Sequence, residues 1–157
     1  MADRASSSIT VDAPPDAVMA VIGDFAAYPT WSAHVKDVTV LATDDAGRGT
    51  QARFSVEAGV FRDQYTLTYD WSVPKTLSWR LVEGQMQKYQ EGSYVLRPLG
   101  PGTEVVYDLT VELAIPMLGL FKRKAEKTII DTALRGLKRQ VEAIYDPGVD
   151  TRQAPGR

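Results

Sequence analysis

The sequence predicts an α+β protein in which a curved antiparallel sheet of about seven strands wraps around one long C-terminal helix, with two short helices after the first strand. Two observations support this fold class. Through the middle of the chain, apolar and polar residues alternate, as in strands with one buried face. From Leu118 to Tyr145, apolar residues instead recur every three or four positions, as on one face of a helix. A lone helix with one apolar face needs a sheet to bury it, so the two observations fit together.

The N-terminal segment predicts one short strand and two short helices. Residues Ser8–Val11 alternate as a strand, and a helix follows from Pro14 to Gly23. Proline is tolerated in the first turn of a helix, and glycine commonly ends one. We expect Asp24 to cap a second short helix, which Pro29 would stop.

Six further segments alternate like strands and are joined by short turn sequences, which predicts an antiparallel meander. One face of these strands is apolar and aromatic and the other is polar. The segments are Val35–Thr43, Thr50–Ala58, Phe61–Trp71, Thr76–Val82, Met86–Pro98 and Thr103–Leu113. We expect a single domain over residues 1–146 and a disordered tail over residues 147–157.

The composition excludes several classes of site. The chain has no cysteine and one histidine, so disulfides, thiolate nucleophiles, Cys-ligated metals and multi-His metal sites are excluded. We expect no metal and no cofactor. The net charge of −2 gives no footprint for nucleic acid. No signal peptide is recognisable, and no apolar run approaches the roughly 18 residues of a spanning helix, so we expect a cytoplasmic protein.

The motifs of the N-terminal segment resemble a known family. They are Ala13-Pro14, Asp24-Phe25 and Tyr28-Pro29-Thr30-Trp31. With the order of elements through Tyr145, they resemble the START-like or Bet v 1-like (SRPBCC) superfamily, and within it the bacterial polyketide cyclase/dehydrase and lipid-transport family. The resemblance implies a helix-grip fold with a cavity between sheet and helix. These motif positions mostly build the fold, so activity has to be argued from the site.

The inner face of the predicted sheet is rich in tyrosine and tryptophan. A dry core would more naturally use phenylalanine and leucine, and a buried tyrosine hydroxyl needs a partner. We therefore expect a ligand cavity, although an ordinary core remains the alternative. The candidate ligand-binding residues are Trp31, Phe54, Tyr65, Tyr69, Trp71, Trp79, Tyr94, Tyr107, Met117, Phe121, Ala125 and Ile129.

The sequence assigns no catalytic residue but offers three candidates. His34 is the one side chain suited to general-base chemistry near neutral pH, with a loop histidine as the alternative. Arg80 and Arg97 could hold a ligand carboxylate if a β-bulge turned either of them inward. Simple alternation places both on the solvated outer face.

The start of the long helix combines an apolar run with positive charge. Cations at a helix N-terminus oppose the helix dipole, so local stability does not explain them. Apolar side chains beside a basic cluster suit transient contact with an anionic membrane or a carrier protein. The alternative is that the apolar residues close the cavity and the charges are solvated. The residues concerned are Met117, Leu118, Leu120, Lys122, Arg123 and Lys124.

These observations favour a protein that binds a small hydrophobic ligand for carriage or sensing. The ligand would be a lipid, an isoprenoid, a quinone or a polyketide-like molecule. One alternative is a polyketide aromatase/cyclase acting on a poly-β-ketone chain. A second is a protein-interaction module with a vestigial cavity. The oligomeric state stays open.

Overall fold

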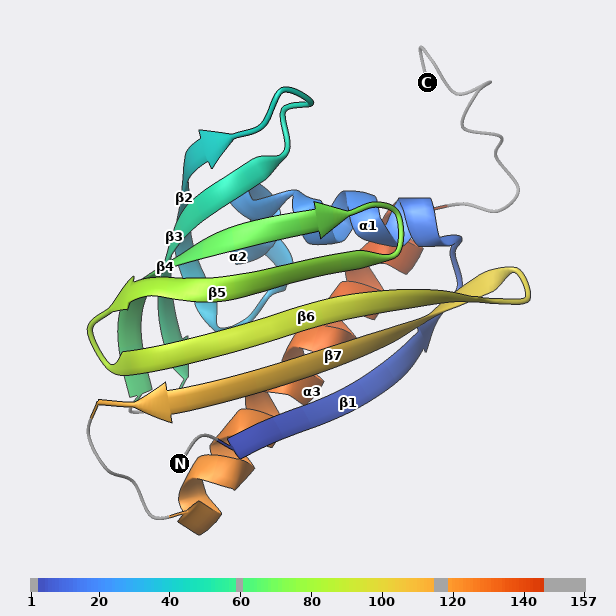
Figure 1. The fold of residues 1–157 in the computed structure, drawn as a ribbon. Helices are drawn as coiled ribbons and strands as arrows, with labels where there is room; N and C mark the ends of the chain where they lie inside the picture. Colours follow the sequence, from blue (N-terminus) through green and yellow to red (C-terminus); the bar gives the residue numbers. More distant parts are fainter. Residues whose placement is uncertain (1–2, 59–60, 115–118, 146–157) are drawn as a thin grey trace.

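The computed structural model describes residues 3–58, 61–114 and 119–145, without the side chains at positions 3, 61, 119–123 and 125. The predicted tail over residues 147–157 lies outside the described residues. Seven strands form one antiparallel sheet in the order β1-β7-β6-β5-β4-β3-β2 (Figure 1). Their bounds are β1 Asp3–Val11, β2 Val35–Thr43, β3 Gly49–Ala58, β4 Phe61–Ser72, β5 Thr76–Gly84, β6 Gln87–Leu99 and β7 Gly102–Leu113. The predicted fold class is confirmed.

The first strand is longer than its sequence pattern indicates. β1 pairs with β7 from Asp3↔Val111 to Val11↔Thr103. The prediction began at Ser8 because the serines before it show no apolar alternation. Backbone pairing does not depend on side-chain hydrophobicity, so the edge of β7 extends the strand over these small residues.

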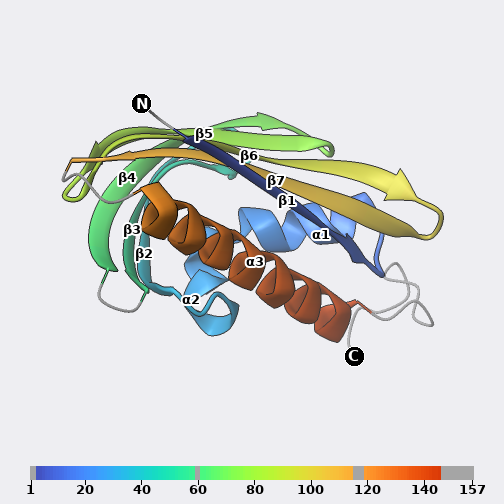
Figure 2. The ribbon, with the colours of Figure 1, turned by 90° about the horizontal axis from the view of Figure 1, so that it is seen from below.

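Helices cover one side of the sheet. They are α1 (Pro15–Gly23), the 3₁₀ turn η1 (Phe25–Ala27), α2 (Tyr28–Trp31) and α3 (Gly119–Ile144). All of them lie against the concave side of the sheet (Figure 2). No helix within the described ranges is long and apolar enough to cross a membrane.

The short helices differ in detail from the prediction. The Asp24 side chain makes no capping hydrogen bond to η1. Pro29 does not stop a helix but lies in the first turn of α2. That position suits proline, since the first N–H groups of a helix have no intrahelical partner.

The long helix packs against one part of the sheet rather than the whole of it. In the described chain, the close contacts of α3 with the sheet are made mainly to β1, with fewer to β7. Leu134, Leu137 and Val141 of α3 are buried in the core. The concave face formed by β3 to β6 therefore lies at a distance from the helix, and the space between them is available for a cavity.

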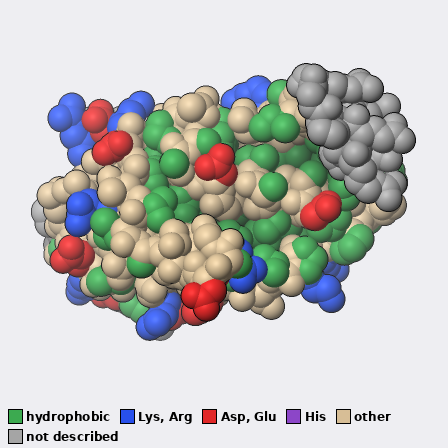
Figure 3. Space-filling view, turned by 90° about the horizontal axis from the view of Figure 1, so that it is seen from above, with side chains coloured by type: hydrophobic (Ala, Val, Ile, Leu, Met, Phe, Trp, Pro, Cys, Tyr) green, Lys and Arg blue, Asp and Glu red, His purple; other side chains and the backbone are tan. Residues whose placement is uncertain are grey.

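The face of the molecule seen from above carries charged side chains of both signs (Figure 3). Lys and Arg lie mostly toward its edge, Asp and Glu lie also nearer its middle, and hydrophobic atoms lie between them. This distribution agrees with the small net charge of −2.

Candidate functional site

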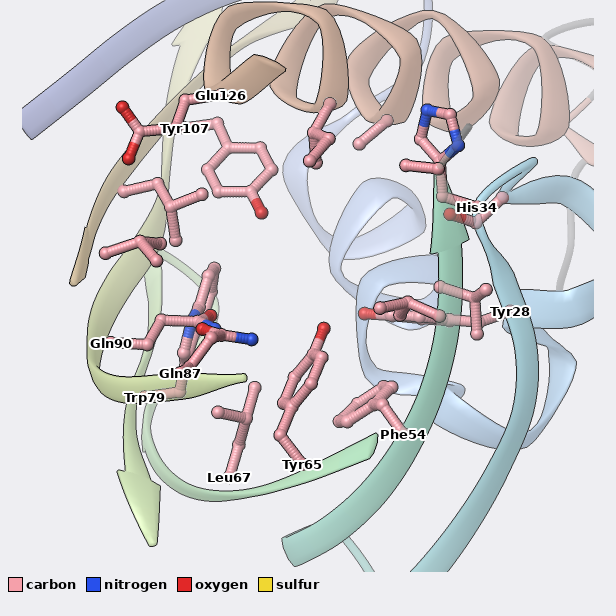
Figure 4. Close-up of a pocket in the computed structure, with 18 of the residues that line it drawn as sticks. Tyr28, His34, Phe54, Tyr65, Leu67, Trp79, Gln87, Gln90, Tyr107 and Glu126 are labelled. Carbon is pink, nitrogen blue, oxygen red and sulfur yellow. The ribbon is translucent and has the colours of Figure 1, made fainter. Parts of the chain in front are cut away.

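A cavity of about 500 Å³ lies between the concave face of the sheet and α3 (Figure 4). Its volume is within the range of small-molecule sites in proteins. Apolar side chains from three sides form much of its wall: Val56 from β3, Leu67 from β4, Leu109 and Val111 from β7, and Ile129 and Ala133 from α3.

The structure brings most of the predicted ligand-binding residues together around this cavity. Those on its wall are Trp31, Phe54, Tyr65, Tyr69, Trp79, Tyr94, Tyr107 and Ile129. Met117 lies outside the described residues, and so do the side chains of Phe121 and Ala125.

Trp71 does not belong with them. Its indole N–H donates a hydrogen bond to the Gly49 carbonyl at 2.7 Å, and its ring packs against Gly23. Strand alternation correctly places Trp71 on the inner face, but α1 and η1 cover that end of the sheet. Its ring centroid lies 6.1 Å from that of Phe25, which is buried in the core. Alternation identifies the face of a strand and does not show which part of that face is hollow.

Aromatic rings form a continuous layer along the cavity floor. The Trp79 ring lies 5.4 Å from that of Tyr94 and 5.7 Å from that of Tyr107, and Phe54 stacks on Tyr65 at 5.6 Å. The hydroxyl groups of Tyr65 and Tyr107 point into the cavity (Figure 4). The wall thus combines apolar ring faces with a few hydroxyl groups.

Burial raises the pKa of the cavity tyrosines above the ordinary value of 10.0, because the tyrosinate anion would lose its hydration. The pKa of Tyr28, which also lines the cavity, is raised for the same reason. The Tyr28 hydroxyl donates to the Ile22 carbonyl. At neutral pH all five phenols are protonated, so they can donate hydrogen bonds but cannot act as bases.

A chain of buried hydrogen bonds runs along one wall of the cavity. Asp63 accepts from the backbone N–H groups of Gln85 and Met86 at 3.1 and 2.9 Å, and from Gln87 Nε2 at 2.8 Å. Gln87 Oε1 accepts from Gln90 Nε2 at 2.5 Å. Gln90 Oε1 accepts from the Trp79 indole N–H at 2.8 Å. Gln87, Gln90 and Trp79 line the cavity, and the Asp63 side chain lies behind them.

The sequence analysis did not predict this chain of hydrogen bonds. Asp63 shares the inward parity of Tyr65 and Leu67 on β4, so its burial was readable from alternation. The two glutamines were not readable, because residues three apart on a regular strand point to opposite faces. A register shift between Gln87 and Tyr89 places both on the inner face of β6.

His34 also lies on the cavity wall, across from the glutamines (Figure 4). Its Nε2 atom is buried and has no hydrogen-bond partner within the described residues, and the same holds for the indole Nε1 of Trp31. The sequence contains no motif that would place a carboxylate beside the imidazole ring to orient it. These two nitrogen atoms belong to cavity-lining residues but have almost no accessible surface of their own.

The hypothesis that an arginine points inward is wrong for both candidates. Arg80 is exposed on the outer face of β5. Arg97 is exposed on β6, where its guanidinium group pairs with Glu104 of β7. The register shift of β6 lies between Gln87 and Tyr89, before Arg97. The side chain of Arg97 therefore stays on the outer face of the sheet, as regular alternation predicts.

Most of the predicted basic junction lies outside the described residues or has undescribed side chains. This applies to Met117, Leu118, Leu120, Lys122 and Arg123. Lys124 is described, and it is exposed at the border of the cavity. Membrane or carrier contact by this segment stays a prediction.

The fold and the cavity define a START-like protein with a helix-grip architecture. The family model described as polyketide cyclase/dehydrase and lipid transport matches residues 2–142, and the chain belongs to this family. No curated protein matches the chain.

Solved structures agree with this assignment. A START superfamily protein from Mycobacterium smegmatis shares 26% identity, with a TM-score of 0.84 over 90% of this chain and 99% of that one. A Thermus thermophilus protein shares 25% identity, with a TM-score of 0.79 over 92% of this chain and 100% of that one. The Zhui aromatase/cyclase from a Streptomyces species shares 15% identity, with a TM-score of 0.79 over 94% and 98% of the two chains. At that identity, the last similarity concerns the fold alone.

Proposed function

We propose that this protein binds a small hydrophobic ligand in the cavity between its sheet and α3, for carriage or sensing. The observation that carries the proposal is a space of about 500 Å³ walled mainly by aromatic and aliphatic side chains. The ligand would be a lipid, an isoprenoid, a quinone or a polyketide-like molecule. The family description, which names both polyketide chemistry and lipid transport, supports this range.

Burial of apolar surface would supply most of the affinity. At about 25 cal/mol per Å², a ligand that buries roughly 300 Å² of apolar surface gains about 7 kcal/mol before the entropic costs of association are subtracted. The cavity tyrosines and glutamines would add a smaller share of the affinity and would fix the orientation of the ligand.

The second candidate function is that of an aromatase/cyclase acting on a poly-β-ketone chain. The observation that favours it is His34, a cavity-lining residue whose buried Nε2 has no hydrogen-bond partner among the described residues. A rotation of the imidazole ring that exposes Nε2 to the cavity would let it take a proton from a bound chain. The cavity tyrosines would act as hydrogen-bond donors to the ketone oxygens rather than as bases, because burial raises their pKa.

The interaction-module alternative fits less well. A vestigial cavity would be filled by larger side chains, whereas this one remains open beside small residues such as Ala133. We therefore place the function inside the cavity rather than on the outer surface.

Native mass spectrometry of the freshly purified protein tests the binding proposal directly. The wild-type protein is expected to carry extra mass from a retained apolar molecule. Ala133→Phe, which directs a large ring into the cavity from α3, is expected to lose that mass and to weaken binding of the neutral fluorophore N-phenyl-1-naphthylamine at least tenfold.

Ala143→Phe is the matched control, because Ala143 is exposed on the same helix and should leave binding unchanged. Equal binding by both variants would contradict the proposal. His34→Gln separates the two functions. If the protein is a binder, His34→Gln leaves ligand binding intact and neither protein turns over a poly-β-ketone substrate. If the protein is a cyclase, the wild type turns over that substrate, and His34→Gln abolishes the turnover while ligand affinity is kept.

A further inference from the structure

We propose that the polar end of the ligand is a neutral carbonyl oxygen, of a ketone, ester or quinone, held by the side-chain amides of Gln87 and Gln90. This inference rests on the proposed function and specifies the ligand class. It is carried by the direction of the hydrogen-bond chain that runs from Asp63 to Trp79.

The direction of that chain is determined at its Trp79 end. At the Asp63 end, Oδ1 accepts from two backbone N–H groups and Oδ2 accepts from the NH₂ group of Gln87. At the other end, the Trp79 indole can only donate, so Gln90 must present its carbonyl oxygen. The central bond from Gln90 Nε2 to Gln87 Oε1 agrees with both assignments.

Among the described residues, this arrangement leaves one N–H of each glutamine without an acceptor and therefore available to a ligand. Each amide nitrogen carries two hydrogens, and the chain uses one of them. Both glutamines are 6% exposed and line the cavity, and the amide end of the pair points into it (Figure 4). A buried N–H group without an acceptor is unfavourable, more so than a carbonyl oxygen with one unused lone pair. A purely apolar ligand would leave these donors without an acceptor, whereas a carbonyl oxygen would accept hydrogen bonds from them.

The acceptor is neutral rather than anionic. Gln87 Nε2 lies 2.8 Å from the Asp63 carboxylate, so an anionic ligand group on the cavity side of this amide would be repelled across a short, poorly screened distance. Among the described residues no arginine lines the cavity, and Lys124, the one lysine there, is exposed.

A matched series of ligands tests the inference on the wild-type protein. Undecane, 2-undecanone and undecanoic acid share a chain length and differ in the polar end. Displacement of N-phenyl-1-naphthylamine is expected to show that the ketone binds roughly tenfold tighter than the alkane, the value of one net hydrogen bond. The acid at pH 8 is expected to bind no better than the alkane. Infrared spectra of carbonyl-¹³C-labelled 2-undecanone should show the C=O stretch shifted to lower frequency on binding.

Gln90→Met removes one donor and keeps a similar volume, and Gln64→Met on the exposed face of β4 is the matched control. The first variant is expected to weaken ketone binding and to reduce the infrared shift while alkane binding persists, because the donor of Gln87 remains. The second variant should change neither ketone binding nor the infrared shift. Equal wild-type affinity for alkane and ketone, or tighter binding of the acid, would overturn the inference and leave the binding function intact. Failure of every ligand and of the fluorophore to bind would instead overturn the proposed function.

Discussion

At the scale of single residues, the position of Trp79 shows how one wall of the cavity is built. The indole N–H is held by Gln90, and the ring lies directly over Gly92 on the neighbouring strand. A Cβ atom at position 92 would lie 2.3 Å from Trp79 Cζ2, closer than any van der Waals contact allows. Glycine is therefore required here for the close approach of a ring rather than for an unusual backbone angle.

Gly92→Ala is predicted to destabilise the protein by about 1–3 kcal/mol, because the ring must shift and its hydrogen bond to Gln90 must weaken. Urea unfolding followed by tryptophan fluorescence measures this change. Ser93→Ala, at the next position of the same strand, is the control and should shift the unfolding midpoint little. A Gly92→Ala midpoint equal to that of wild type would show that Trp79 can move without cost.

At the scale of elements, the contact between α2 and α3 sets the position of the second wall. Gly136 of α3 faces the Trp31 backbone, and a Cβ atom there would lie 2.8 Å from the Trp31 carbonyl oxygen. Trp31 and His34 both line the cavity, and they come from the end of α2 and the residues that follow it. The close approach of these two elements thus positions the unpartnered nitrogen atoms of that wall.

Gly136→Ala is predicted to destabilise the protein, although alanine normally stabilises a helix by about 1 kcal/mol relative to glycine. The added methyl group would push α2 away from α3 and alter ligand affinity as well as stability. Thermal unfolding and fluorophore binding measure the two effects. Ala143→Gly, on an exposed position of the same helix, calibrates the propensity effect alone. A more stable Gly136→Ala protein with unchanged binding would contradict this account of the α2–α3 contact.

At the scale of the whole molecule, the buried phenols make stability depend on high pH. Burial raises the pKa of Tyr28, Tyr65, Tyr69, Tyr94 and Tyr107 in the folded protein above the value of 10.0 that they have when exposed. Above pH 10 the unfolded chain therefore binds fewer protons than the folded one. The free energy of unfolding then falls as the pH rises.

The contribution of the buried tyrosines to the free energy of unfolding is predicted to be constant below about pH 9 and to fall steeply above pH 10. Each buried tyrosine contributes up to about 1.4 kcal/mol per pH unit to this loss. Circular dichroism and tyrosinate absorbance, recorded together during an alkaline titration, should change in one cooperative step. Smooth ionisation of all the tyrosines near pH 10 in a protein that remains folded would show that the phenols are accessible to water.

The amino-acid sequence by itself determined the order of the elements and the family, and it indicated the inner face of the regularly alternating strands. These properties depend on local periodicity, turn residues and short motifs, which a linear chain displays directly. Where the pattern was weak, as in the serines of β1 or the prolines around α2, backbone pairing and the geometry of the first helical turn decided the outcome.

Only the tertiary structure decided which inner-face residues surround a cavity. Alternation treats Trp71 and Trp79 alike, but α1 covers the end of the sheet near Trp71, whereas α3 packs against β1 and stands away from Trp79. The polar wall was decided in the same way. A register shift in β6 brings Gln87 and Gln90 to one face, and long-range hydrogen bonds to Asp63 and Trp79 orient their amides. Such contacts join residues distant along the chain, so no local pattern of sequence could reveal them.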